Sequence, residues 1–262
     1  MTGAALALAG VLMQVLLRNP LADPYILGVS GGASVAALTV MLIGLTGIWI
    51  DMGAGIGALC ATLLVFGLAH GGGAWTPTRL LLTGVVIAAG CGAIVSLMLA
   101  LGPETRLRGM IFWLMGDLSI DPTPWRVLAV LAPVLVFSVV AARHLNLLAR
   151  GEMEAQSLGL SVGRARAGIF LAGSLLTAGA VTTAGSIGFV GLVTPHLVRM
   201  VMGSDHRIVV PASALLGGIL LVLADLLART LIAPRQLPVG ALTALIGVPL
   251  FLVLVRRQRF VA

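Results

Sequence analysis

The 262-residue chain contains no lysine, only two cysteines and one tyrosine, and charged residues make up 10% of it. Soluble domains carry about a quarter charged residues, so this composition excludes an ordinary soluble domain and indicates an integral membrane protein. The lysine of a Walker A loop contacts the nucleotide phosphates, so a chain without lysine cannot itself carry that ATP site. Aromatic residues are scarce at 5% while glycine is abundant at 34 residues, which favours closely packed transmembrane helices over a β-barrel.

The two cysteines, Cys60 and Cys91, lie inside apolar runs without the spacing of metal ligands. We interpret them as packing residues and expect no metal or other cofactor on this chain. The net charge is +7, but the arginines that produce it gather on one side of the expected topology. The charge therefore gives no reason to expect nucleic acid as a partner.

Nine apolar segments approach the ~17 to 25 residues that cross a bilayer, so the lipid bilayer is the expected environment. These segments are Met1–Leu17, Tyr25–Gly47, Met52–His70, Leu80–Leu101, Val127–Ala142, Gly168–Ile187, Phe189–Met202, Ile208–Ala228 and Pro238–Val255.

The arginine distribution predicts the orientation, because positive residues are retained in the cytoplasm. With the carboxyl end inside, eleven of the 16 arginines lie on the cytoplasmic side and five on the outer side. An odd number of spans then places Met1 outside, although Met1 opens directly into an apolar run without a polar flank or a signal-peptide n-region. We therefore expect that a first helix is missing from this sequence.

The stretch 143–166 is the only long run in which charges are frequent and no membrane-length apolar segment fits. Its apolar residues recur at roughly helical spacing, which predicts two short amphipathic helices broken near Gly151 and Gly159. Such a surface indicates a docking site for a cytoplasmic subunit. A solvated connector is the alternative interpretation.

Other loops carry weaker signals. Residues 103–124 contain a short amphipathic helix, roughly Arg106–Met115, which is too short to span the membrane and is expected at the outer mouth. On the inner side, the glycine-rich stretch 70–79 leads into Pro77, a residue well tolerated in a first helical turn, and this junction is a candidate gate. Glycine-rich helix starts at Gly28–Ala33 and Gly185–Gly191 enter the membrane from opposite sides and suggest an inverted repeat.

Three isolated signals have both a functional and a structural interpretation. Residues 28–32 match the nucleophile pattern G-x-S-x-G, but no histidine is evidently paired with Ser30, which argues against an intramembrane protease. His196 follows a proline and is interpreted as structural rather than as a haem ligand. Asp225 is a candidate proton relay, but Arg229 follows four residues later, the spacing of a helical ion pair.

Residues 5–34, ALALAGVLMQVLLRNPLADPYILGVSGGAS, strongly resemble the permease subunits of bacterial ABC importers for cobalamin, haem and ferric siderophores, the FecCD/BtuC-like family. The resemblance covers essentially the whole chain. It continues through TRLLLTGV (78–85), WLMGDL (113–118), LARGEMEAQSLGL (148–160), GSIGFVGLVTPHLVRM (185–200), DHR (205–207), LADLLAR (223–229) and LPVGALTALIGVPLFL (237–252).

This resemblance implies an all-α, polytopic transmembrane bundle with the ten-helix fold of ABC importer permeases, here without its first helix. It also implies that residues 1–262 form a single permease domain in the bacterial cytoplasmic (inner) membrane. The expected partners are a second copy of the chain in a homodimer, two cytoplasmic ATPase subunits that hold ATP and magnesium, and a substrate-binding protein outside. The Arg-x-Pro-Arg stretch that family members carry before their second helix is absent.

The resemblance also assigns site residues. The 143–166 loop is expected to insert into a groove on the ATPase, as amphipathic helices do. Its coupling residues are Arg150, Gly151, Glu152, Ala155, Leu158 and Gly159. The inner gate is expected at Thr76, Pro77 and Thr78. The outer mouth and the docking surface for the binding protein are expected at Arg106, Arg108, Arg229 and Arg235.

The predicted function is the pore subunit of a binding-protein-dependent ABC importer for a metal chelate, not an enzyme. Haem is favoured over ferric siderophore or cobalamin, because outer arginines would attract its propionates. The alternative is an ion-coupled secondary transporter, which inverted repeats permit. The scarcity of acids near the midplane and the prominent cytoplasmic loop count against that alternative.

Overall fold

A computed structural model describes residues 1–70, 76–118 and 125–258, with side chains described as far as Val253. Within these ranges the chain is helical and contains no strand. The elements are α1 (Thr2–Leu17), the 3-10 helix η1 (Pro24–Leu27), α2 (Val29–Leu42), α3 (Ile48–His70), α4 (Pro77–Leu101), α5 (Glu104–Met115), α6 (Trp125–Val140), α7 (Ala142–Arg150), α8 (Glu152–Ser157), α9 (Val162–Ala184), α10 (Val190–Met202), α11 (His206–Thr230) and α12 (Val239–Gln258).

Helix α1 forms the centre of the bundle, packed against α9, α10 and α11. Its sequence is apolar on every face, as expected for a fully enclosed helix, and no side chain from Ala5 to Leu16 is more than 3% exposed. Glycines allow the helix backbones to touch. A Cβ atom placed on Gly10 would lie 1.9 Å from the carbonyl oxygen of Gly191, and one on Gly217 would lie 2.5 Å from that of Gly3.

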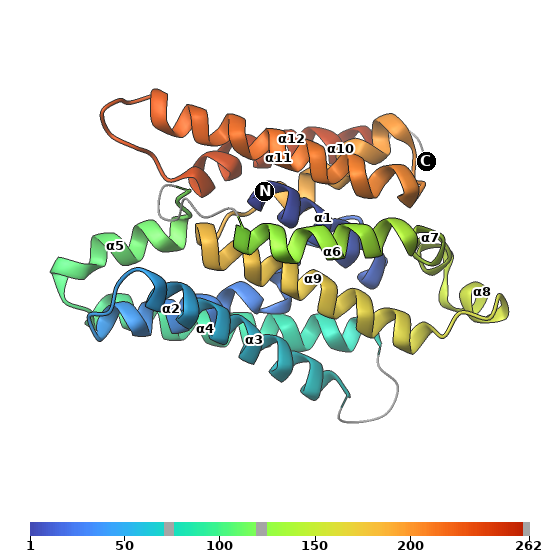
Figure 1. The fold of residues 1–262 in the computed structure, drawn as a ribbon, viewed down its shortest axis with the longest axis horizontal. Coiled ribbons are helices and arrows are strands. Elements are labelled where there is room, and N and C mark those ends of the chain that lie inside the picture. The colour runs from blue at the N-terminus through green and yellow to red at the C-terminus, as the bar shows by residue number, and fades with distance from the viewer. Residues whose placement is uncertain (71–75, 119–124, 259–262) are drawn as a thin grey trace.

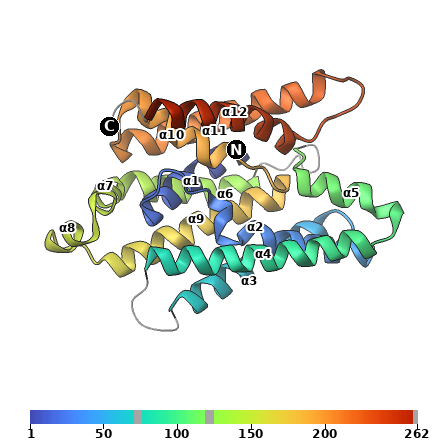
Figure 2. The ribbon, with the colours of Figure 1, turned by 180° about the vertical axis from the view of Figure 1, so that it is seen from behind.

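The bundle has two distinct ends (Figure 1). Helix α5 and the connection between α11 and α12 lie at one end, whereas α7, α8 and the end of α12 lie at the other. Figure 2, the view from behind, shows the same separation and places the start of α4 at the end that carries α7 and α8. The elements that the arginine distribution assigned to one side of the membrane therefore lie together.

All nine segments expected as spans are helical, but they differ in length. Helices α3, α4, α9 and α11 are each long and apolar enough to cross a membrane, and α6 with α7 forms a fifth candidate bent by 66°. Helices α1, α2, α10 and the described apolar part of α12 are shorter. The 16 residues of α1 extend for about 24 Å, less than the ~30 Å of a hydrocarbon core.

Two of the shorter helices begin at breaks that lie against each other. Gly28, with φ 75°, precedes α2, and Phe189, with φ 69°, precedes α10. The backbone N–H of Ile187 donates to the Tyr25 hydroxyl at 3.0 Å. Ser30 Oγ donates to Ser186 Oγ at 3.1 Å, so its partner is a serine and not a histidine base. The two glycine-rich helix starts expected from the sequence are confirmed, and their polar groups satisfy one another inside the bundle.

Candidate functional site

The expected pair of short amphipathic helices is confirmed as α7 and α8. Leu145 and Leu148 of α7 are each 2% exposed and anchor this helix to the bundle. Gly151 separates the two helices with φ 153°, a conformation that favours glycine. Gly159, with φ 82°, follows α8. The two glycines of the motif thus allow the chain to turn away from the membrane and back.

A bidentate ion pair attaches α8 to the start of α9. Nη1 and Nη2 of Arg166 lie 3.2 and 2.8 Å from Oε1 and Oε2 of Glu152. The Arg166 side chain is 5% exposed and that of Glu152 is 38% exposed. Because an arginine and a carboxylate that meet through two parallel hydrogen bonds fix each other's orientation, Glu152 determines how α8 projects from the bundle.

The other side chains in and next to α8 divide into an inner and an outer face. Ala155 is fully buried, whereas Met153 is 86% exposed and Leu158 is 62% exposed. Arg150 lies 3.7 Å from Glu154, and both side chains are at least half exposed. The helix therefore presents two bare apolar side chains with a charged rim, which is the arrangement of a helix that binds in a groove.

A side-chain cluster ties α7 to the turn between α10 and α11. Asn146 Nδ2 donates to Asp205 Oδ1 at 2.8 Å, and Asn146 Oδ1 accepts the backbone N–H of His206 at 2.9 Å. Asp205 also caps α11 by accepting the N–H of Arg207 at 3.0 Å. The Arg207 N–H and the Asn146 amide lower the pKa of the Asp205 carboxyl.

The expected inner gate lies at the start of α4. Thr76 is the N-cap, and its hydroxyl accepts the backbone N–H of Arg79 at 3.3 Å. Pro77 occupies the first helical turn, where a missing N–H removes no intrahelical bond. Thr78 is exposed. The glycine-rich residues 71–75, which the gate hypothesis also includes, lie outside the described residues.

At the opposite end, the expected outer arginines differ in their surroundings. Arg106 donates to the carbonyl oxygens of Met41, at 2.8 Å, and Leu42, so it caps the end of α2. The guanidinium of Arg108 lies 5.8 Å from the ring centroid of Phe112. Residues 119–124 of the expected outer gate region lie outside the described residues.

The connection between α11 and α12 carries the other two arginines. Arg229 Nε donates to Asp225 at 2.9 Å, which confirms the ion pair expected from their spacing. Arg235 is exposed. Gln236 donates to Asp117 at 3.2 Å and joins this connection to the segment that follows α5. Of the four arginines expected at the outer mouth, Arg108, Arg229 and Arg235 therefore have exposed side chains, while Arg106 is half-buried.

The sequence interpretation missed two partners. The sequence interpretation treats Arg166 only as a topological charge, although an arginine in the second turn of an apolar helix indicates an acidic partner. Asn146 carried no comparable signal, because its role depends on α7 reaching the turn at Asp205. The described part of the chain brings together no group of three or more His, Cys, Asp or Glu side chains that would hold a metal ion.

The model of the FecCD transport family matches residues 1–257. The chain belongs to the FecCD transport family. FecCD relatives include the hemin transport system permease protein HmuU of Yersinia pestis, 44% identical over 98% of this chain and 79% of its own length. Another is the cobalamin import system permease protein BtuC of Halobacterium salinarum, 41% identical over 97% of this chain and 69% of its own length.

A solved inward-facing ABC transporter described as of the metal-chelate type has the same fold as this FecCD protein. The TM-score is 0.89 at 32% identity, over 98% of this chain and 82% of that one. The long apolar helices of the bundle agree with this membership. This FecCD protein is therefore a multi-pass permease of the cytoplasmic membrane.

Proposed function

We propose that this FecCD protein is the pore subunit of a binding-protein-dependent ABC importer and that two copies form the translocation path for a metal chelate. On this proposal the chain performs no covalent chemistry. Two cytoplasmic ATPase subunits hold ATP and magnesium, and a binding protein delivers the substrate from outside. Relatives named for hemin and cobalamin transport support the substrate class.

The observation that carries the proposal is the exposed face of α8. Met153 and Leu158 are largely exposed, and this exposure does not stabilise the bundle on its own. A groove on a partner protein would remove both side chains from water. The ion pair between Glu152 and Arg166 holds this face at a constant angle to α9. A partner that closes on ATP binding can therefore move α9 through α8 as a rigid body, which is the motion that gating needs.

Helix α4 supports the homodimer. Only 6% of its most apolar 18-residue window is buried within one chain. Gly90 and Gly92 face open space, since a Cβ atom on either would meet nothing within 4 Å. Small residues on an uncovered transmembrane helix allow close helix–helix approach. A second copy packed along α4 would place the expected gate residues 76–78 at the inner entrance of a shared path.

Co-purification with the cognate ATPase tests the coupling role. Replacing Met153 and Leu158 together by aspartate should abolish ATPase association and ATP-driven uptake in proteoliposomes. The matched control exchanges the two residues, Met153→Leu with Leu158→Met, which keeps the face apolar and should preserve both activities. Unchanged association of the aspartate variant would contradict the proposal.

For the substrate we favour haem over ferric siderophore and cobalamin. Arg108, Arg229 and Arg235 present exposed side chains at the outer end, where they would attract carboxylates of an arriving ligand or acidic groups of its binding protein. The absorbance spectrum of the co-purified binding protein is the direct test. A Soret band supports haem, and a corrinoid spectrum contradicts that choice in favour of cobalamin.

The proposal also requires an external source of energy. The ion pair with Arg229 accounts for Asp225, which was the strongest candidate proton relay for an ion-coupled transporter. Proteoliposomes that contain the permease alone should accumulate no substrate under an imposed proton or sodium gradient. Accumulation without any ATPase would refute the proposal.

A further inference from the structure

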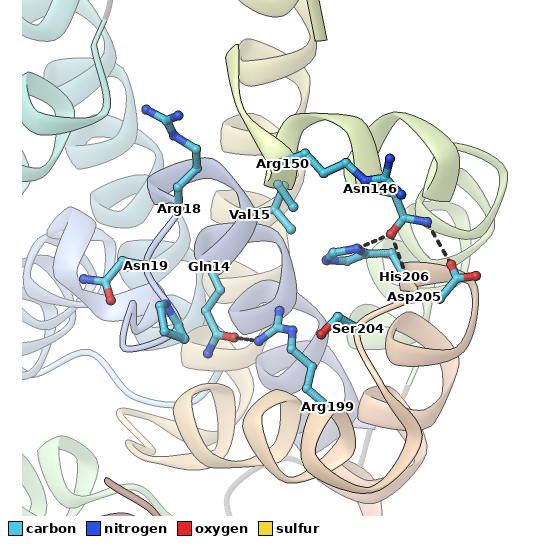
Figure 3. Close-up of a pocket in the computed structure, with 12 residues that line it drawn as sticks. Gln14, Val15, Arg18, Asn19, Asn146, Arg150, Arg199, Ser204, Asp205 and His206 are labelled. Atoms are coloured by element: carbon cyan, nitrogen blue, oxygen red, sulfur yellow. Dashed lines mark hydrogen bonds between the residues drawn. The ribbon is translucent and has the colours of Figure 1, made fainter. Parts of the chain in front are cut away.

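At the end that carries α7 and α8, the bundle contains a cavity of about 580 Å³ between four helices. The walls are the last turn of α1, the end of α7, the end of α10 and the beginning of α11. This size lies within the range of ordinary ligand pockets, roughly 300–1,000 Å³. Figure 3 shows the side chains that surround it.

Three arginines from three helices line the cavity. They are Arg18 after α1, Arg150 at the end of α7 and Arg199 in α10. Arg199 donates to Oε1 of Gln14, a neutral partner that leaves its charge uncompensated. Among the described residues Arg18 has no side-chain hydrogen bond or ion pair, and Arg150 has only the distant, exposed Glu154.

One acid lines the cavity, and it is already engaged. Asp205 accepts hydrogen bonds from Asn146 and from the backbone N–H of Arg207. Figure 3 shows its carboxylate beside Asn146 at the right of the view, apart from Arg199 and Arg18. Three cationic groups thus face the cavity, with one aspartate at its edge.

His206 provides an independent observation. Its side chain is 3% exposed, and Nδ1 lies 2.6 Å from Asn146 Oδ1, while the buried Nε2 has no partner in the described structure. Figure 3 shows the ring edge that points away from Asn146 directed toward the space between Val15 and Gln14. A polar ligand in the cavity would give this buried nitrogen the hydrogen-bond partner that it lacks in the described structure.

The conformation of Arg18 agrees with a binding role. Its φ of 47° and ψ of 39° are left-handed, and at this helix end glycine or asparagine is the usual residue. Arginine is less favourable than glycine or asparagine in this left-handed conformation. At this position, however, it places a guanidinium at the cavity entrance. Left-handed non-glycine residues persist where the surrounding structure or a function requires them.

We propose that this cavity binds a phosphate group, carried either by an anionic phospholipid of the adjacent leaflet or by a soluble phosphate compound. Arginines match phosphate oxygens with several donors each, and basic pockets between transmembrane helices at the cytoplasmic side are typical sites for anionic lipid headgroups. The assignment to the cytoplasmic side rests on the proposed function, but phosphate binding does not. A bound phosphate would join α1 and α10 to Arg150, directly before the α8 coupling helix.

The test measures binding to the purified full-length chain, independently of transport. The chain is placed in nanodiscs of phosphatidylcholine alone or with added phosphatidylglycerol, and retained lipid is identified by native mass spectrometry. Inorganic phosphate is titrated in detergent with the thermal midpoint as readout. Enrichment of phosphatidylglycerol supports a lipid source, and a midpoint shift with phosphate supports a soluble source.

Variants connect the binding to the cavity. Arg18→Asn suits the left-handed backbone, and Arg199→Gln removes the second charge. We expect about a five-fold loss of affinity for each arginine removed, as for basic residues that meet anionic headgroups. Arg79→Gln, on the same side of the membrane but outside the cavity, should bind as the parent does.

If Arg199→Gln fails to fold, Arg18→Asn alone still decides the question, because its side chain is exposed. Equal binding by Arg18→Asn and the parent chain would overturn the proposal, as would the absence of both phosphatidylglycerol enrichment and a phosphate response. Because none of these readouts involves the ATPase, failure here is distinguishable from failure of the proposed importer function.

Discussion

Replacing Glu152 by glutamine tests how α8 is held. The substitution keeps the shape of the side chain but removes the negative charge of Glu152 from beside the guanidinium of Arg166, which is 5% exposed. Breaking a fully buried pair costs about 3–5 kcal/mol, and an exposed pair is worth about 0.2–1 kcal/mol. Because Glu152 is 38% exposed, water reaches one partner, and we expect a cost of about 2–4 kcal/mol, between these limits.

This cost should appear as local opening of α8, since the pair connects α8 to α9 at a point outside the main core. A change of 2–4 kcal/mol corresponds to roughly a 30- to 700-fold faster amide exchange for residues that exchange by this opening. The backbone N–H groups of Ala155 and Leu160, which donate to carbonyls in and next to α8, are the reporters. In proteoliposomes that also contain the ATPase subunits, ATP hydrolysis should be poorly coupled to uptake by this variant.

Glu154→Gln is the matched control, because it makes the same chemical change one turn away in the same helix. Glu154 lies 3.7 Å from Arg150, with both side chains largely exposed, so its removal should change exchange by less than about five-fold. Equal exchange in the two variants would refute the conclusion that Glu152 positions α8. Recovery of slow exchange in Glu152→Arg with Arg166→Glu would confirm that the pair itself is responsible.

Three further predictions concern packing and charge. Gly217→Ala should lower the thermal midpoint sharply, since its Cβ would lie 2.5 Å from a neighbouring carbonyl oxygen, whereas Gly218→Ala, whose Cβ meets nothing within 4 Å, should not. Asp205 has a lowered pKa in the folded state, so its cap stabilises the start of α11 above the ordinary Asp pKa of about 3.9, and the protection of the first α11 amides, relative to their intrinsic exchange rate at each pH, should fall as pH falls below that value. Asp225→Asn should change the free energy of unfolding by no more than about 1 kcal/mol, because Arg229 is 45% exposed in that pair, and uptake should persist; loss of uptake would restore the proton-relay hypothesis.

The sequence predicted the helical elements well because apolar length and periodicity are local properties. The short helices on both sides of Gly151 and the ion pair of Asp225 with Arg229 followed from spacing alone. The lengths of the spans did not follow. Helices α2 and α10 begin inside the bundle, where Tyr25 accepts the backbone N–H of Ile187 and Ser186 accepts the hydroxyl of Ser30. The two residues of each hydrogen bond are more than 150 positions apart in sequence.

The amino-acid sequence by itself determined that this chain lies in a membrane, is built from helices and presents a charged loop on one side, since each of these depends on composition and local spacing. Only the tertiary structure decided that α1 is the enclosed centre, that Arg166 pairs with Glu152, and that Arg18, Arg199 and His206 surround one cavity. The physical reason is that burial and charge pairing depend on which helices meet. Helix contacts at glycines such as Gly10 and Gly191 bring together residues whose distance in sequence carries no information about their distance in space.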